Sequence, residues 1–405
     1  MAIGRSTGTR KPGEQVVLLG FAEAMAAIEA TWSLQRAGFR VVAFRRAKSR
    51  PALRRVRGIE LHDVPGPEVD SAATVAAVAA LADDLKPAAI LPLDDSALWA
   101  CSQLTDLAVP LAGAYGDAIG YALDKGLQLE AAGQVGLPVP PTQVLNKLSD
   151  GGLINFPVMV KPARALYEVG GMLDRPAGVI CADSQEFEQA AARPWPGPLL
   201  VQPFIHGVGE GLFGHVGPRG VTGWSSHRRV RMINPQGSAS SACRSNPVDE
   251  ELLEPSERFL DAIGWRGMFM LEFLRDSDGK PWFMELNGRA WGSMALARRR
   301  GFEYPGWTVQ AALDPGFEPI PPASSPEILC RNLGMELVHL MFVARGPQSS
   351  APMEWPRLRR AVGDVCRLGP HDRLYNWKRS QPDVLVADTL GTLGRYARKL
   401  VGSRR

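Results

Sequence analysis

A pair of glutamates on a predicted β-hairpin constrains this chain more than any other feature. Residues 267–293 read GMFMLEFLRDSDGKPWFMELNGRAWGS, in which two apolar strands flank the turn signal Asp278-Gly279. If the hairpin closes through the four residues 277–280, Glu272 and Glu285 are directly opposed. Opposed residues share one face of a sheet, with β-carbons about 4.5 to 5.5 Å apart. The two carboxylates are therefore expected to be neighbours.

The other face of this hairpin is expected to lie in a hydrophobic core. It carries Phe269, Leu271, Phe273, Trp282, Met284 and Leu286, and the same register pairs Leu274 with Phe283 and Asp276 with Pro281. Two carboxylates side by side above such a core repel each other and are costly to desolvate unless a cation lies between them. Solvated glutamates that are neighbours by chance are the alternative, which the apolar flanks and the following Arg289 and Gly292 disfavour.

The next polar residue on the second strand completes a set of oxygen ligands. Asn287 lies two residues after Glu285 and would point to the same face. Two carboxylates and an amide suit Mg²⁺, which typically takes one or two carboxylates, water, and phosphate oxygens from a substrate; Mn²⁺ accepts the same ligands. The hairpin therefore predicts a divalent-cation site beside bound phosphate.

Strand and helix signals alternate along the first part of the chain. After a polar tail, residues 1–14, apolar strands are predicted at 16–19, 41–44 and 88–93, and helices at 23–37, 71–85 and 94–104. Such alternation favours an α/β domain with a parallel sheet covered on both sides. We assign this domain to residues 15–114.

The rest of the chain has a different texture. One amphipathic helix is predicted over 117–136, ended by Gly136 and followed by the proline-rich exit LPVPPT. Short strands separated by Gly and Pro then indicate an α+β domain over 115–318. A C-terminal extension of mixed helices, residues 319–405, follows, and its last helix is predicted at about 388–401.

Composition sets broad limits on function. The 405 residues are 45% hydrophobic and carry a net charge of +4, which fits a soluble globular protein and gives no reason to expect a nucleic-acid partner. The five cysteines are far apart and never form a C-x-x-C pair, so neither a disulfide framework nor a thiolate metal site is indicated. The polar start lacks the apolar segment of a signal peptide. We expect a cytoplasmic protein without stable membrane anchoring, and leave a homodimer open.

Five motifs occur in a recognisable order. They are Leu123-Asp-Lys-Gly126, Phe156-Pro-Val-Met-Val-Lys-Pro162, Leu200-Val-Gln-Pro-Phe-Ile-His-Gly207 with Glu210, Met270-Leu-Glu-Phe273, and Met284-Glu-Leu-Asn-Gly-Arg289 with Trp291-Gly-Ser293. In these residues the chain resembles the ATP-grasp superfamily, in particular the branch of carbamoyl phosphate synthetase ATP-binding domains and other carboxylate-amine ligases. The match covers about residues 117–315. The domain before it is similar to the Rossmann-like domain that usually precedes a two-lobed ATP-grasp domain.

The resemblance implies a function for each matching residue. The implied ATP contacts are Lys125, Lys161, the hinge residues Gln202, Pro203, Phe204 and Ile205, and, at the ribose, Glu210. The implied Mg²⁺ ligands are Glu272, Glu285 and Asn287, and the implied catalytic cations are Lys161 and Arg289. From the residues alone, a strand-end lysine that reaches solvent is the preferred interpretation of Lys161. For Lys125 the residues do not distinguish a phosphate contact from an ordinary surface residue of a helix.

The implied activity is that of an ADP-forming ligase. A carboxylate is a poor electrophile, but transfer of the γ-phosphoryl group of ATP makes an acyl phosphate that an amine or similar nucleophile can attack. Phosphoryl transfer needs positioning and charge neutralisation more than covalent chemistry from the protein. The implied partners are ATP with Mg²⁺, a small-molecule or peptide carboxylate, and an amine.

A basic strand follows the hinge. Alternation would place His227, Arg229 and Arg231 on one face, where three cations could receive a substrate carboxylate or a phosphate; a solvated edge strand guarded by charge is the alternative. The lid expected after Lys161 and Pro162 has only two glycines, Gly170 and Gly171, which leaves its function open.

Two other functions remain open at this stage. The first is a nucleotide-binding protein without ligase activity. The second is an NADP-dependent oxidoreductase that uses the N-terminal domain, which is disfavoured because residues 19–25, LGFAEAM, lack the G-x-G-x-x-G fingerprint.

Overall fold

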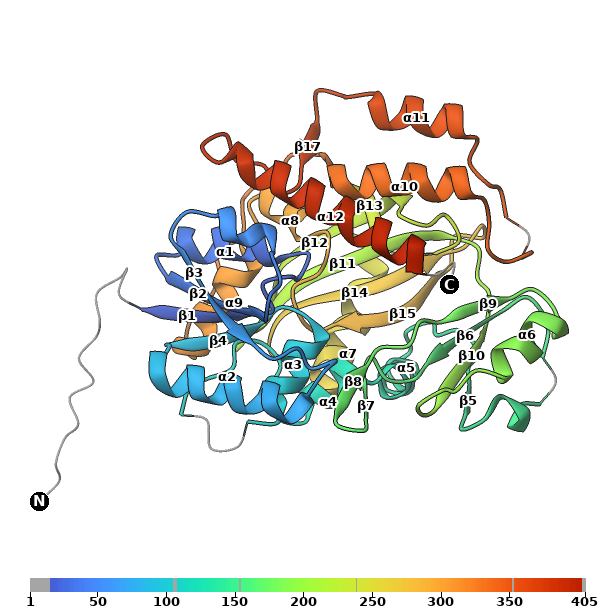
Figure 1. The fold of residues 1–405 in the computed structure, drawn as a ribbon, viewed down its shortest axis with the longest axis horizontal. Helices are drawn as coiled ribbons and strands as arrows, with labels where there is room; N and C mark the ends of the chain where they lie inside the picture. The colour runs from blue at the N-terminus through green and yellow to red at the C-terminus, as the bar shows by residue number, and fades with distance from the viewer. Residues whose placement is uncertain (1–14, 105–107, 153, 238, 352, 403–405) are drawn as a thin grey trace, which may run out of the picture.

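The fold is described from a computed structural model. It covers residues 15–402 except 105–107, 153, 238 and 352, and side chains as far as residue 398. The polar tail predicted at 1–14 lies outside the described residues. Figure 1 shows the arrangement: a parallel sheet near the N-terminus, a large sheet in the centre, a small sheet on the other side, and C-terminal helices above.

The N-terminal part is an α/β unit. Its four strands are parallel in the order β3-β2-β1-β4. The elements are β1 (Val16–Gly20), α1 (Ala27–Arg36), β2 (Arg40–Arg46), η1 (Ala52–Arg55), β3 (Ile59–Val64), α2 (Ser71–Leu85), β4 (Ala89–Pro92) and α3 (Asp95–Ser102). The predicted parallel strands are present, and α2 has the predicted bounds. Strand β3 was not predicted, because it lies at the edge of the sheet and is mostly half-buried.

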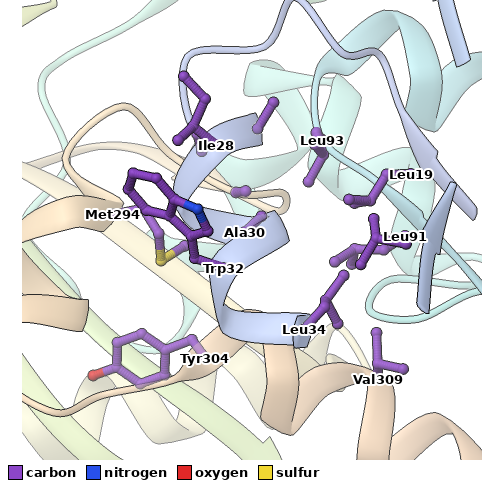
Figure 2. Packing of buried hydrophobic residues seen from close by; sticks show 14 of the residues in the cluster. Leu19, Ile28, Ala30, Trp32, Leu34, Leu91, Leu93, Met294, Tyr304 and Val309 are labelled. Atoms are coloured by element: carbon purple, nitrogen blue, oxygen red, sulfur yellow. The ribbon is translucent and has the colours of Figure 1, made fainter. Parts of the chain in front are cut away.

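Helix α1 joins this unit to the rest of the molecule. Figure 2 shows Trp32 and Leu34 of α1 in one buried cluster with Leu91 of β4, with Met294 of α8 (Met294–Arg299) and with Val309 of α9 (Tyr304–Leu313). Helices α8 and α9 follow the carboxylate hairpin in sequence. The N-terminal unit and the large sheet therefore share a hydrophobic core.

The small sheet forms one lobe. Its strands are β5 (Gln143–Leu145), β6 (Val158–Pro162), β9 (Val179–Cys181) and β10 (Leu199–Pro203), in the order β5-β10-β6-β9, with η2 (Leu148–Asp150) and α6 (Ser184–Ala191). One face packs on α6 around Val158, Val160 and Val201. Met159 and Lys161 alternate with Val158 and Val160 along β6 and therefore lie on the other face of the small sheet. Figure 1 shows that this face is turned toward the large sheet.

The large sheet forms the second lobe. Its strands are β11 (Val208–Gly217), β12 (Gly220–Met232), β13 (Ser240–Asn246), β14 (Gly267–Arg275), β15 (Pro281–Asn287), β16 (Leu329–Arg331) and β17 (Asp372–Leu374), in the order β15-β14-β11-β12-β13-β16-β17. Phe269, Leu271 and Phe273 of β14 pack with η3 (Glu250–Leu252), α7 (Leu253–Ala262), α4 (Ala118–Leu123) and α5 (Lys125–Gln134). One face of the hairpin is thus in the core, as predicted.

The helix predicted over 117–136 is wrong in one respect, because the chain breaks it at Asp124. That residue has extended φ and ψ of −125° and 107°, and its carboxylate accepts hydrogen bonds from the backbone N–H of Gly126 at 2.9 Å and of Leu127 at 3.2 Å. It therefore ends α4 and caps α5. The break makes Lys125 the first residue of α5.

The C-terminal segment is not purely helical. It contains α10 (Leu333–Arg345), α11 (Leu358–Cys366) and α12 (Pro382–Gly402), but β16 pairs with β13 and β17 pairs with β16. This segment therefore completes the large sheet. Helix α12 begins six residues before the predicted start, and its Leu390 is 64% exposed. Among the described residues, no helix is long and apolar enough to cross a membrane.

Candidate active site

A cavity of about 820 Å³ lies where the small sheet, the large sheet, the N-terminal unit and the C-terminal segment meet. The hinge residues 202–207 line it, together with residues of β12, β14, β15 and the loop after β15. Of the predicted site, Gln202, Pro203, Phe204, Ile205, His227, Arg229, Glu272, Glu285, Asn287 and Arg289 line this one space. The fold therefore brings together motifs that are up to 87 residues apart in the sequence.

The two glutamates of the hairpin are paired as predicted. Glu272 of β14 is directly opposite Glu285 of β15, and both line the cavity. Asn287 lies on the same strand as Glu285, and its side-chain amide donates to Glu285 Oε1 at 3.2 Å. Two carboxylates and an amide are thus held side by side on the cavity face.

The predicted register is wrong near the turn. A bulge between Glu272 and Phe273 pairs Phe273 with Phe283 and Leu274 with Trp282, whereas the sequence predicted Leu274 opposite Phe283. The predicted pair of Asp276 with Pro281 is replaced by Arg275 with Pro281. As a consequence Phe283 packs in the core and Met284, predicted to be in the core, lines the cavity.

Each carboxylate has a cation of its own. Arg229 of β12 approaches Glu272 at 2.6 Å between Nη2 and Oε2, and Lys125 Nζ contacts Glu285 Oε2. Lys125 reaches Glu285 because the break at Asp124 places it at the start of α5. That helix is fixed to β15 by Gln128, whose side chain accepts from the backbone N–H of Leu286 at 2.8 Å. The carboxylates are therefore neutralised by side chains, as their repulsion requires.

Lys161 is held among charges of both signs. Burial, and then the charge of Lys125, lowers the pKa of Lys161 to about 7, although Glu272 raises it. Burial also lowers the pKa of Lys125, against the opposing charges of Asp95 and Glu272. Two ammonium groups with lowered pKa beside one another are poised to gain stability from a bound polyanion.

Arg289 has a partner that the sequence did not indicate. Its guanidinium donates to both oxygens of Asp95, at 3.0 and 3.4 Å, and Arg175 Nη2 lies 2.8 Å from the same carboxylate. Burial raises the pKa of Asp95, but the charges of Arg289 and Arg175 outweigh it, so the pKa lies below its usual value. Asp95 stands at the start of a helix, where a carboxylate has an ordinary structural explanation, so its link to Arg289 has no sequence signal.

The hinge offers an unpaired amide to the cavity. Gln202 is 1% exposed, its Nε2 donates to Thr142 Oγ1 at 2.8 Å, and its Oε1 finds no hydrogen-bond partner among the described residues. Met159, Leu274 and Met284 line the cavity beside it. An apolar slot with one unpaired polar atom fits a planar base that carries hydrogen-bonding groups on its edge.

Glu210 is not on this face of the sheet. It pairs with Phe273, a core residue, whereas its neighbours Gly209 and Gly211 pair with Leu274 and Glu272, which line the cavity. Its carboxylate accepts from Arg275 Nε at 2.9 Å. The ribose contact implied for Glu210 therefore does not match its position.

The basic strand contributes one cation to the cavity instead of three. His227, Arg229 and Arg231 do share a face, as alternation predicted, since Arg228 and Val230 are exposed. However, burial, and then Arg229, lowers the pKa of His227 to about 3, so its ring is neutral at pH 7. Arg231 forms two 2.9 Å hydrogen bonds with Glu336, which is 1% exposed.

The segment after Lys161 forms a short hairpin that is docked on the N-terminal unit. It consists of β7 (Tyr167–Val169) and β8 (Met172–Asp174), joined by Gly170 and Gly171. Ser71 N donates to Gly171 O at 2.8 Å, and Leu173 N donates to Pro67 O at 2.7 Å. Arg175, which follows β8, reaches Asp95. This segment therefore covers the charged part of the site from the small lobe.

The donor set fits a divalent cation only together with a ligand. Among the described residues, no three His, Cys, Asp or Glu side chains are grouped to hold a metal ion. Glu272, Glu285 and Asn287 supply three side chains with hard oxygen atoms, and Mg²⁺ completes such a set with water and phosphate oxygens. The residues thus suit a cation that arrives with a phosphorylated ligand.

Solved structures share this architecture. An L-amino acid ligase from Bacillus licheniformis aligns with a TM-score of 0.59 and 18% identity, covering 75% of each chain. A biotin carboxylase from Campylobacter jejuni aligns at 0.60 and 16%, covering 78% of this chain and 74% of its own, and the ADP complex of an N5-carboxyaminoimidazole synthetase from Staphylococcus aureus at 0.61 and 15%, covering 80% and 83%. The chain has the ATP-grasp fold.

Sequence comparison finds similarity over part of the chain. D-alanine–D-alanine ligase of Pseudomonas putida is 26% identical over 192 residues, which is 45% of this chain. The chain spans 59% of the length of that relative, and a second P. putida ligase of the same kind matches equally. No protein-family model matches the chain.

Proposed function

We propose that this protein is an ATP-dependent, Mg²⁺-requiring ligase that activates a carboxylate as an acyl phosphate and couples it to an amine. The observation that carries the proposal is the Glu272–Glu285 pair, held by Arg229 and Lys125 in the same cavity as the hinge amide of Gln202. Names of similar proteins, several of them ligases or carboxylases, support the same class of reaction.

The proposed reaction has two steps. A carboxylate oxygen of the substrate attacks the γ-phosphorus of ATP, the bond from that phosphorus to the β,γ-bridging oxygen breaks, and ADP leaves. The amine then attacks the acyl carbon, phosphate leaves with the electron pair of the carbon–oxygen bond, and the amine loses its proton to water. Both steps require that negative charge be neutralised where it moves.

Different residues of the site bind the base, the phosphates and the metal ion in this proposal. Gln202 orients the base, while Lys161 of the small lobe and Lys125 of α5 hold the phosphates. Arg289, kept in place by Asp95, faces the phosphoryl group that is transferred and the substrate carboxylate that receives it. Glu272, Glu285 and Asn287 would hold Mg²⁺, which when bound supplies further neutralisation of the phosphate charge. Arg229 then remains beside Glu272 as a further cation near the reacting groups.

The site has the charge that a polyanion requires. Lys125, Arg175, Arg229 and Arg289 surround Glu272, Glu285 and Asp95, so four cations face three carboxylates, and Lys161 adds a fifth when a phosphate favours its charged form. A bound nucleotide alone would compensate this excess of positive charge. The charge of the site is therefore also consistent with a nucleotide-binding protein without ligase activity. The two functions differ in whether ADP is released.

Glu285→Gln is the test. The amide keeps the size of the side chain and removes one negative charge from the proposed metal ligands, so we expect Mg-dependent ADP release to fall by at least a hundredfold with unchanged circular dichroism. The control is Glu318→Gln, a carboxylate paired with Arg219 at the surface. ADP is measured with a coupled assay across a panel of carboxylates and amines. ADP release by Glu285→Gln within a few-fold of the parent would sink the assignment.

A further inference from the structure

The cavity extends beyond the proposed nucleotide and metal residues, toward the two ends of the chain. There it is lined by the segment between β1 and α1, by the start of α3, by the turn after β12, and by the C-terminal segment. The lining side chains of this end used below are Glu23, Met25, Asp94, Met232, Met335 and Met353. None of them belongs to the predicted ATP site.

One side of this end is acidic. Glu23 and Asp94 share a single guanidinium, that of Arg46, at 3.5 and 3.7 Å, and Arg46 also donates to Glu68 at 3.1 Å. The two lining carboxylates, Glu23 and Asp94, therefore share one guanidinium, and Arg395 of α12 lines the same end of the cavity. Glu23 Oε1 accepts from Arg46 N and from Ser49, and its buried Oε2, which accepts no hydrogen bond from the described residues, is the atom that lies 3.5 Å from Arg46 Nη1. Two carboxylates that share one guanidinium can accept a second cationic group, that of a ligand.

The other side is apolar and adaptable. Met25, Met232, Met335 and Met353 come from four different segments, and Met335 packs in a cluster with Ile233 and Val338. Methionine side chains are unbranched and polarizable, so they adjust to apolar groups of different shape. Tyr396 of α12 closes this side. A ligand there presents hydrocarbon.

Three buried polar side chains independently indicate a ligand in the cavity. His227, Trp291 and Ser293 are 1%, 1% and 7% exposed, line the cavity, and have side-chain polar atoms without hydrogen-bond partners among the described residues. The indole N–H of Trp291 can only donate, so its ligand must offer an acceptor. Buried polar groups without partners are rare in native proteins, which makes this concentration informative.

The acidic side lies next to the guanidinium proposed to face the reacting carboxylate. Asp94 and Asp95 are consecutive, and Asp95 holds Arg289 at 3.0 Å. An α-amino acid carries an ammonium and a carboxylate on the same carbon, which suits adjacent sites of opposite charge. We propose that the carboxylate substrate is an α-amino acid with an apolar side chain, its carboxylate at Arg289, its ammonium at Glu23 and Asp94, and its side chain among the four methionines.

This inference rests on the proposed ligase function only in placing the carboxylate of the amino acid at Arg289. Binding of the amino acid does not depend on that function. The test is calorimetric titration of the full chain with leucine, both enantiomers, with and without Mg·ADP. The comparison ligands are 4-methylpentanoate, which lacks the ammonium, and glycine, which lacks the side chain. We expect the preferred leucine enantiomer to bind at least tenfold more tightly than either.

Two variants assign the contacts. Glu23→Gln keeps the acceptor for Arg46 N and Ser49, and should weaken leucine about tenfold or more while leaving 4-methylpentanoate within twofold. Met353→Glu places a charge on a half-buried lining position, and should weaken leucine but not glycine. The control is Leu390→Glu, at an exposed position on α12, which should change neither.

The outcomes separate the two proposals. Equal affinity for leucine and 4-methylpentanoate, or no binding of leucine to a chain that binds Mg·ADP, overturns the amino-acid site and leaves the ligase proposal standing. Selective binding of leucine by a chain that neither binds Mg·ADP nor releases ADP supports the amino-acid site and refutes the ligase. An unaltered preference in Glu23→Gln overturns the ammonium contact.

Discussion

The lowered pKa of Lys161 predicts that nucleotide affinity depends on pH in a defined direction. Burial lowers this pKa from the ordinary 10.5 to about 7, with Lys125 contributing in the same direction. A phosphate beside the amine favours its charged form. At pH 8 the free protein must therefore take up a proton when the nucleotide binds.

The magnitude follows from the pKa. Each pH unit above 7 adds about 1.4 kcal/mol to the free energy of protonating Lys161, so affinity for Mg·ADP should fall about tenfold per unit between pH 8 and 9. Titration calorimetry in two buffers of different ionisation enthalpy measures the proton uptake, which should approach one proton per nucleotide. In Lys161→Arg the guanidinium stays charged, and this contribution to the pH slope should vanish.

The stability of the free protein should depend on pH in the opposite direction to its nucleotide affinity. A lysine whose folded pKa lies below its unfolded pKa binds its proton more tightly in the unfolded chain, so the free protein gains stability as pH rises from about 7 toward 10.5. Lys161→Met should therefore raise the melting temperature at pH 7 while weakening Mg·ADP. Affinity that is flat from pH 7 to 9 in the parent, or a Lys161→Met variant that loses stability, would refute the reasoning.

Two further variants test individual contacts. Asp95→Asn removes the buried negative charge shared by Arg289 and Arg175, and should lower the free energy of unfolding by roughly 3 kcal/mol in urea titrations, together with ADP release; a loss below about 0.5 kcal/mol would contradict the ion-pair assignment. Glu210→Gln should leave Mg·ADP affinity within about twofold, because this carboxylate lies on the face away from the cavity; a tenfold loss in calorimetry would restore the ribose contact that the sequence implied.

The pairing of Glu272 with Glu285 could be predicted from the alternation of the two strands, although the turn signal placed the residues near the turn one position out of register. The bulge after Glu272 could not be predicted. The residues near the turn alternate equally well in the predicted register, with Leu274 opposite Phe283, and in the observed one, with Phe273 opposite Phe283. The bulge depends on Asp276, whose side chain accepts from the backbone N–H of Asp278 and Lys280 and enlarges the turn to five residues. Met284 enters the cavity only as a result of this bulge.

Other parts of the site depend on contacts that leave no local pattern. Arg231 and Glu336 are 105 residues apart, and nothing near either residue indicates that they pair. By contrast, the helix break at Asp124 had a readable signal, because an aspartate before a helical run is a common N-cap. The amphipathic pattern of 117–136 obscured it. Features set by neighbouring residues, such as a helix cap, could thus be predicted. Whether a given basic side chain lines the cavity or is taken up by a distant ion pair could not.

Strand β11 separates the hairpin that carries Glu272 from strand β12, and its Gly211 lets side chains of the two approach each other. Glu285, Glu272, Gly211 and His227 lie in one row across the four adjacent strands β15, β14, β11 and β12. A β-carbon at Gly211 would lie 2.7 Å from Phe213, 2.9 Å from His227 Nε2 and 3.0 Å from Met270. The glycine therefore leaves the space in which the side chains of β12 approach Glu272.

This geometry predicts that Gly211→Ala impairs the site more than the fold. The added methyl group should displace His227, raising the KM of the carboxylate substrate at least fivefold, because overpacking on the cavity side can relax into the open space. Gly214→Ala is the matched control on the same strand, since its β-carbon would meet Phe269 in the core at 2.7 Å. That variant should lose about 1 to 3 kcal/mol of stability with an unchanged KM. If both variants change KM equally, the glycine row does not shape the cavity.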